Sequence, residues 1–151
     1  MNKETHQLPS ILIVDDDEID VRALRRAWKK RALSNPIYSA ENGRAALDML
    51  LGKDCELDKP YIVLLDINMP VMDGMEFLEA LRSEPSLHDT VVFVLTTSDD
   101  ERDIKRAYKK HIAGYLVKDR VGEDFRNLIS LLESLTITIK FPRRPMSTNV
   151  A

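Results

Sequence analysis

The chain has 151 residues, a length that fits one compact domain. Its 22 Lys and Arg against 25 Asp and Glu leave a net charge of −3, without the basic excess of a duplex-binding protein, so we expect no nucleic-acid partner. The single cysteine, Cys55, cannot form an internal disulfide, and no apolar run reaches the roughly 18 residues of a membrane span, which predicts a cytoplasmic protein that does not enter a membrane.

Five short apolar runs predict five buried strands, at residues 11–14, 37–40, 61–65, 91–95 and 115–117. Between them, apolar residues recur at helical spacing, as Val21, Leu24 and Trp28 do early in the chain and Ile104 and Ala107 do later. Strands without polar alternation are typical of a parallel sheet that is covered on both faces. The sequence therefore predicts a doubly wound α/β fold with helices on both faces of a parallel sheet.

The C-terminal end has a different pattern. A last helix is expected over about residues 123–135, which completes a domain spanning residues 8–135. Residues 136–141 then alternate between polar and apolar side chains, which predicts a strand in a C-terminal arm of residues 136–151 that ends in a flexible, Pro-rich tail. Such a strand leaves Ile137, Ile139 and Phe141 without a core. Either the arm reaches across a homodimer, or it folds back on its own domain.

Polar side chains follow four of the predicted strands. Asp15, Asp16 and Asp17 come after the first strand, Asp66 after the third, Thr96 ends the fourth, and Lys118 follows the fifth. Ligands bind outside the carboxyl ends of the strands in such a sheet, so we expect these side chains to converge at one edge. Clustered carboxylates repel one another unless a cation lies between them, and oxygen ligands suit Mg²⁺.

The acidic run after the first strand has a second interpretation. Asp16 or Asp17 can cap the helix that follows, since carboxylates are stabilised at a helix N-terminus. Capping does not account for Asp66, because Pro70 and Gly74 place the next helix several residues further on. The capping and metal-binding interpretations of the acidic run both remain open at this point.

The segments ILIVDDDEID, LLDINMPVMDG, VLTTS and GYLVKD, in this order, resemble the CheY-like receiver domains of two-component response regulators over about residues 11–135. DVRALRRAW, VLTTSDDERD and VKDRVGEDF resemble, more narrowly, the small regulators paired with bacterial phytochrome histidine kinases. The resemblance implies a flavodoxin-like sheet with strand order 2-1-3-4-5. One departure is Asp119, which stands where most receivers have Pro after the lysine.

The resemblance also implies the chemistry. Asp66 is expected to accept a phosphoryl group from a phosphohistidine on a histidine kinase or a histidine phosphotransferase, which forms an aspartyl phosphate. Asp15, Asp16, Asp66 and the backbone carbonyl of Asn68 are expected to hold Mg²⁺, which neutralises phosphoryl oxygens. Lys118 is expected to contact the phosphoryl group. Without the family pattern, the alternative interpretation of Lys118 is a solvated surface lysine.

The same resemblance implies a switch. Thr96 is expected to move toward the phosphoryl group while Tyr115 packs inward behind it; otherwise the two are a strand-end hydroxyl and a core aromatic. No effector domain is expected, so the output is expected to be binding, phosphorelay or competition for phosphate. A homodimer can form through the C-terminal arm or through the face from the fourth to the fifth helix. That face carries basic side chains that are otherwise a solvated surface: Lys105, Arg106, Lys109, Lys110 and His111.

Two rival functions remain. A haloacid-dehalogenase-type phosphatase also forms an aspartyl phosphate with Mg²⁺, and Asp15 and Asp17 supply its DxD spacing. That family expects Thr or Val at the position of Ile19 and a later acidic pair, and it leaves Asp66 unused. The other rival is a receiver-fold scaffold that is never phosphorylated. We expect a phosphoacceptor that signals, and not an enzyme acting on other substrates.

Overall fold

The computed structural model describes residues 8–52 and 60–141. Within these ranges, five strands alternate with α-helices along the chain. The strands are β1 (Ser10–Val14), β2 (Ile37–Ala40), β3 (Tyr61–Leu65), β4 (Val91–Thr96) and β5 (Gly114–Val117). The helices are α1 (Glu18–Lys30), α2 (Gly43–Leu51), α3 (Gly74–Ser83), α4 (Glu101–Tyr108) and α5 (Arg126–Thr138), with 3₁₀ turns η1 (Lys118–Arg120) and η2 (Glu123–Phe125) before α5. Cys55 lies outside the described residues.

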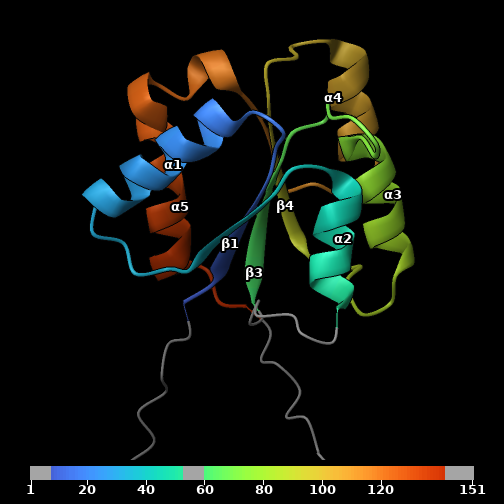
Figure 1. The fold of residues 1–151 in the computed structure, drawn as a ribbon, viewed down its shortest axis with the longest axis horizontal. Coiled ribbons are helices and arrows are strands. Elements are labelled where there is room, and N and C mark those ends of the chain that lie inside the picture. Colours follow the sequence, from blue (N-terminus) through green and yellow to red (C-terminus); the bar gives the residue numbers. More distant parts are fainter. Residues whose placement is uncertain (1–7, 53–59, 142–151) are drawn as a thin grey trace, which may run out of the picture.

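The strands form one parallel sheet in the order β2-β1-β3-β4-β5, which confirms the predicted fold class and topology. Helices α1 and α5 cover one face of this sheet, and α2, α3 and α4 cover the other (Figure 1). Every residue of β1 and β3 is buried, because these strands have neighbours on both sides and helices on both faces. No helix in the described part of the chain has the length and apolar character needed to cross a bilayer.

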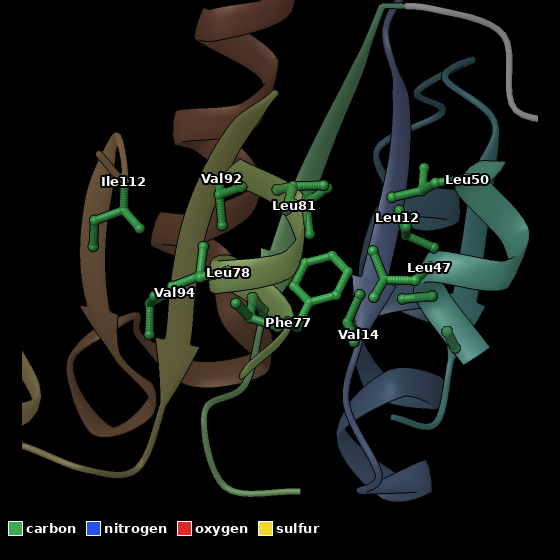
Figure 2. Packing of buried hydrophobic residues seen from close by; sticks show 14 of the residues in the cluster. Leu12, Val14, Leu47, Leu50, Phe77, Leu78, Leu81, Val92, Val94 and Ile112 are labelled. Atoms are coloured by element: carbon green, nitrogen blue, oxygen red, sulfur yellow. The ribbon is translucent and has the colours of Figure 1, made fainter. Parts of the chain in front are cut away.

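Alternate residues of each strand enter two separate cores. Leu12 and Val14 point toward α2 and α3. There Phe77 of α3 lies fully buried between the sheet and α2 (Figure 2). Ile11 and Ile13 point to the opposite core, beneath α1 and α5. Both sets of side chains are apolar, which explains why the strands lack polar alternation in the sequence.

The predicted strand over residues 136–141 is wrong. Helix α5 continues through Thr138, across the expected domain boundary at residue 135, and residues 139–141 belong to no strand. A helix satisfies its backbone groups internally, whereas a strand here has no partner strand beside it among the described residues. Thr136 supports the extra turn, since its hydroxyl donates to the carbonyl of Leu132 at 2.8 Å and accepts from the side chain of Asn35 at 3.2 Å. The tail expected after residue 141 lies outside the described residues.

The start of the last helix also differs from the prediction. It begins at Arg126, three residues later than position 123, because Asp124 and Phe125 have φ angles of 52° and 57°. Two successive left-handed residues turn the chain away from a helical path. Phe125 still packs against the core beneath α1 and α5, and so does Phe141 after the helix.

Arg82 joins α3 to the edge of the sheet that lies opposite the carboxyl ends of the strands. Arg82, in the last turn of α3, donates to the backbone carbonyls of Lys110 (2.7 Å), His88 (2.8 Å), Thr90 (2.8 Å) and His111 (2.9 Å). These carbonyls come from the loops that precede β4 and β5. Arg82 therefore joins α3 to the starts of two neighbouring strands.

We predict that Arg82→Met lowers the free energy of unfolding by about 2–4 kcal/mol, because four charge-assisted hydrogen bonds are lost, two of them partly buried. Arg102→Met is the matched control, since in the part of the chain described its guanidinium contacts only the exposed Asp100, two residues earlier. Urea unfolding of both variants measures the effect. Equal stability of the two variants would show that the Arg82 contacts contribute nothing.

Candidate functional site

Two carboxylates lie side by side where the central strands end. Asp15 follows β1 and Asp66 follows β3, and these strands are in register, with Val14 opposite Leu65. The backbone N–H of Asp66 donates to the carbonyl of Val14 at 2.9 Å, which extends the pairing past the strand end. The site therefore lies at the carboxyl edge of the sheet, where β1 leads into α1 at the top of Figure 1.

Asp16 joins these two residues in an acidic cluster. Asp15, Asp16 and Asp66 each offer an oxygen, and these oxygens lie within 4.8 Å of one another; Asp15 and Asp66 are buried, and Asp16 is exposed. Asp17 does not belong to the cluster: it is the N-cap of α1, and its Oδ1 accepts from the N–H groups of Ile19 (3.0 Å) and Asp20 (3.2 Å). The capping interpretation therefore holds for Asp17, and the cluster contains the other two residues of the run.

The amine of Lys118 lies among the carboxylates. Its Nζ is 2.8 Å from Asp15 Oδ2, 2.7 Å from Asp20 Oδ2 and 3.4 Å from Asp66 Oδ2, and its side chain is 9% exposed. Although Asp119 replaces the usual proline, the chain enters η1 at Lys118 and still places the amine in the site. The contact between Lys118 and Asp66 joins residues that are 52 positions apart in the sequence.

The sequence-based site did not include Asp20. A signal for it is present, however: Asp20 is the third residue after the capping Asp17, and a side chain at that helical position leans back toward the N-terminus. The N-terminus of α1 lies at the carboxyl edge of β1. Recognising Asp17 as the cap would have placed Asp20 close to the site.

Burial and charge act in opposite directions on these groups. Burial raises the pKa of the Asp15 carboxyl from 3.8 to about 6, although hydrogen bonds from Lys118 and from the Asp17 N–H oppose this. Burial by itself lowers the pKa of Lys118, but hydrogen bonds to Asp15 and Asp20 and the charges of Asp15 and Asp66 outweigh it, so the pKa of the amine rises above 10.5. Lys118 therefore carries a full positive charge at neutral pH.

The loop after Asp66 is held tightly against the strand end. An added Cβ on Gly74 would lie 2.5 Å from the Ile67 Cα and 2.6 Å from the Asp66 carbonyl oxygen, so only glycine allows α3 to start here. Val71 is the central residue of a three-residue turn, closed by the Met72 N–H to the Pro70 carbonyl at 2.8 Å, and has a φ of 67°. Positive φ is strained for a β-branched residue, and Val71 is 81% exposed.

Asn68 lies at the start of this loop. Its backbone N–H donates to Asp66 Oδ1 at 3.1 Å, which fixes one oxygen of that carboxylate, and its side chain is exposed. The loop therefore orients Asp66 so that its other oxygen, Oδ2, faces Lys118.

Thr96 and Tyr115 are linked through Ser98. Thr96 is fully buried at the end of β4, and its hydroxyl accepts weakly from the Ser98 N–H at 3.4 Å. The Tyr115 hydroxyl donates to the Ser98 carbonyl at 2.9 Å, and the Ser98 hydroxyl donates to Asp103 of α4 at 2.7 Å. The loop between β4 and α4 thus connects the site to β5 and α4.

The acidic cluster fits a hard divalent cation. All its donors are carboxylate oxygens, and no His or Cys belongs to this cluster in the described ranges. Oxygen-only donors favour Mg²⁺, Mn²⁺ or Ca²⁺ over zinc. Asp15, Asp16 and Asp66 are the residues that would hold the ion.

Comparison with known proteins agrees with this geometry. The family model described as "Response regulator receiver domain" matches residues 11–130. The chain belongs to the response regulator receiver family. It is thus a receiver domain of two-component signalling, as the motifs at the strand ends predicted.

The similar proteins include response regulators of phytochrome and red light signaling. The chain is 31% identical to the response regulator Rcp1 of Synechocystis sp. over 145 residues, covering 94% of this chain and 99% of the relative. The Mn(2+)-bound form of Rcp1 superimposes with a TM-score of 0.78 at 31% identity, covering 89% and 99% of the two chains. The phosphorylated cyanobacterial phytochrome response regulator RcpA gives 0.73 at 27% identity (87% and 96% covered). RPA3017, from red light signaling of R. palustris, gives 0.76 at 29% (91% and 100% covered).

The family match and the geometry of the site both argue against a haloacid-dehalogenase-type phosphatase. That alternative needs Asp15 and Asp17 to act together, but the Asp17 carboxylate caps α1, while Asp15 contacts Lys118. Asp66, which the alternative leaves unused, lies in the acidic cluster.

Because the pKa of Asp15 is raised, we expect ionisation of its carboxyl to lower the free energy of unfolding in a pH-dependent way. The folded protein holds this proton more tightly than the unfolded chain, so ionisation destabilises the fold as pH rises from about 4 to about 6. Without divalent metal, Asp15→Asn should raise the free energy of unfolding by about 1–3 kcal/mol at pH 7.5 and by much less at pH 4.5. Urea unfolding in a chelating buffer measures this, with the exposed Asp48→Asn as control. A gain that is equal at both pH values would contradict burial as the cause.

Proposed function

We propose that the protein accepts a phosphoryl group on Asp66 in a Mg²⁺-dependent reaction and passes the change to its protein contacts. The observation that carries this proposal is the position of Asp66 Oδ2, buried among the acidic cluster and 3.4 Å from the Lys118 amine. A buried carboxylate with a fixed cation beside it is suited to phosphoryl transfer, where positioning and charge contribute more than covalent help.

The proposed step forms a bond between an Asp66 carboxylate oxygen and phosphorus. The bond from phosphorus to the histidine nitrogen of the donor breaks, and the imidazole leaves with the electron pair. Asp15, Asp16, Asp66 and the Asn68 carbonyl would hold Mg²⁺, which would supply positive charge to neutralise phosphoryl oxygens. Lys118 offers its N–H donors to one of these oxygens, and the N–H of Asn68 holds the other Asp66 oxygen in place.

The phosphoryl group adds about −1.5 to −2 charges at the sheet edge. Charged hydrogen bonds contribute about 1.5–3 kcal/mol each, so one to Thr96 and one to Lys118 approach the roughly 5.5 kcal/mol that inverts a 1:99 population. Movement of Thr96 would change its contact with Ser98, to which the Tyr115 hydroxyl is also bonded. Thr96 and Tyr115 are in this way the proposed switch residues.

Asp66→Asn should abolish phosphorylation, because an amide is not a nucleophile toward phosphorus. The measurement is uptake of label from a small-molecule phosphodonor with Mg²⁺, followed by mass spectrometry of the intact protein. Asp48→Asn, which removes an exposed carboxylate on α2, is the control and should behave like the wild type. Label uptake by Asp66→Asn at the wild-type rate would refute the assignment, and no uptake by the wild type would favour the scaffold function.

The proposed phosphodonor is a histidine kinase of the phytochrome type, or a histidine phosphotransferase. Support comes from the relatives: RcpA is a phytochrome response regulator, and RPA3017 is assigned to red light signaling, each matched over at least 87% of this chain. A cytoplasmic location and the lack of a nucleic-acid partner stay predictions from the sequence.

We also propose that the protein forms a homodimer through its C-terminal segment, with the face from α4 to α5 as the second candidate interface. Ile137 and Ile139, at the end of α5, are 77% and 42% exposed, and Tyr108 on α4 is 49% exposed. Exposed apolar side chains at the end of a helix favour burial against a second copy.

Replacing Ile137 and Ile139 together with Ser should weaken the proposed dimer at least about tenfold, because burying two apolar side chains contributes about 1.4 kcal/mol or more. Sedimentation equilibrium measures the dissociation constant. Lys140→Ser, at the neighbouring exposed position, is the control and should leave it unchanged. A dimer of undiminished affinity in the double variant, or a wild type that stays monomeric, would contradict this interface.

A further inference from the structure

Asp20 differs from the other carboxylates around Lys118. Asp15 and Asp66 belong to the acidic cluster, which in the described ranges contains those two residues and Asp16. Asp20 lies outside it, on the first turn of α1, and yet its 2.7 Å contact with the amine is shorter than the contacts of Asp15 and Asp66. The amine is thus held both by the cluster and by a residue that belongs to the helix.

The amine and a divalent cation need the same oxygens. Asp15 Oδ1 accepts from the Asp17 N–H at 2.9 Å, and Asp15 Oδ2 accepts from Lys118. Asp66 Oδ1 accepts from the Asn68 N–H, and Asp66 Oδ2 faces Lys118. A cation bound by Asp15 and Asp66 draws on these same oxygens and repels the amine, so both contacts weaken when it binds. The contact with Asp20 does not have to be shared.

The local structure keeps Asp20 in place. Asp17 caps α1 by accepting from the backbone N–H of Asp20 at 3.2 Å, and the negative charge of Asp20 is favourable in the first turn of a helix. The side chain is 24% exposed, so its charge is only partly removed from water. On the other side, Lys118 begins a 3₁₀ turn with Asp119 as the next residue, without the ring that stiffens this position in most receivers.

We propose that Asp20 is a positioning residue that keeps the Lys118 amine beside Asp66 while a divalent cation occupies the oxygens of Asp15 and Asp66. The amine then passes to the incoming phosphoryl group, whose oxygens carry more negative charge than one carboxylate. The proposal rests on the proposed phosphoacceptor function, and it assigns to Asp20 the task of having the lysine in place before the phosphoryl group arrives.

The first test observes the amine directly and needs no phosphorylation. In ¹⁵N-labelled protein, the Lys118 ammonium signal is identified by its disappearance in Lys118→Met and is followed during a Mg²⁺ titration. In the wild type the signal should persist at saturating Mg²⁺, because a held ammonium exchanges its protons slowly. In Asp20→Asn it should broaden beyond detection as Mg²⁺ binds. Persistence of the signal in Asp20→Asn would overturn the proposal.

The second test measures phosphorylation at saturating Mg²⁺ with a small-molecule phosphodonor. Asp20→Asn should slow it about tenfold, as expected when one charged hydrogen bond is lost, and Asp20→Glu should restore most of the rate. In a Lys118→Met background, Asp20→Asn should have no further effect. Glu18→Gln removes one charge from the same helical turn at a side chain that is 84% exposed, and it should leave the rate unchanged.

An equal loss from Asp20→Asn with and without Lys118 would overturn the proposal, as would an equal loss in Glu18→Gln. A wild type that takes up no label would instead refute the proposed phosphoacceptor function, and the ammonium signals would then decide the role of Asp20 alone.

Discussion

The contact of the Lys118 amine with Asp15, Asp20 and Asp66 is the interaction on which the site depends. The fold brings carboxylates from β1, β3 and α1 to the same edge, and two of them are buried there. Buried like charges are unfavourable unless a positive charge lies between them. Lys118 supplies that charge from the start of η1, directly after β5, and in doing so it connects the end of the sheet's edge strand to its centre.

The same carboxylates and amine serve both the stability of the fold and the proposed function. A stable fold benefits from neutralising the carboxylates with the amine, whereas the proposed metal and phosphoryl group would require these same oxygens and the same amine. The raised pKa of Asp15 is one consequence, because the amine offsets only part of the cost of burying the carboxyl. In the proposed function these contacts are exchanged, and Asp20 is the partner of Lys118 that lies outside the cluster.

The loop after Asp66 contributes rigidity. Gly74 allows α3 to start against the Asp66 carbonyl, and Val71 adopts a strained φ in an exposed turn. Such strain persists only where the surroundings fix the backbone. Here the Met72 carbonyl accepts from the Gly43 N–H of α2 at 3.1 Å, and Met69 is buried in the core below. The packing of α2 and α3 thus holds the loop, and the loop orients the carboxylate.

The sequence by itself determined the fold class, the strands and the identity of the clustered carboxylates. Uniformly apolar runs specify strands buried on both faces, and residues at the ends of parallel strands must meet at one edge. It also indicated Lys118, because a lysine directly after a strand of the parallel sheet has its amine at that same edge. These are local patterns whose consequences follow from the geometry of a parallel sheet.

The tertiary structure decided three further points. Residues 136–138 alternate like a strand but are helical, because residues 8–52 and 60–141 offer no neighbouring strand to pair with them and the Asn35 side chain bonds Thr136. The sequence left capping open between Asp16 and Asp17, and the path of the chain into α1 assigns it to Asp17. Asp20 reaches Lys118 across 98 residues of sequence, since α1 and the end of β5 meet only in the folded chain. Local periodicity does not encode contacts between distant elements; packing does.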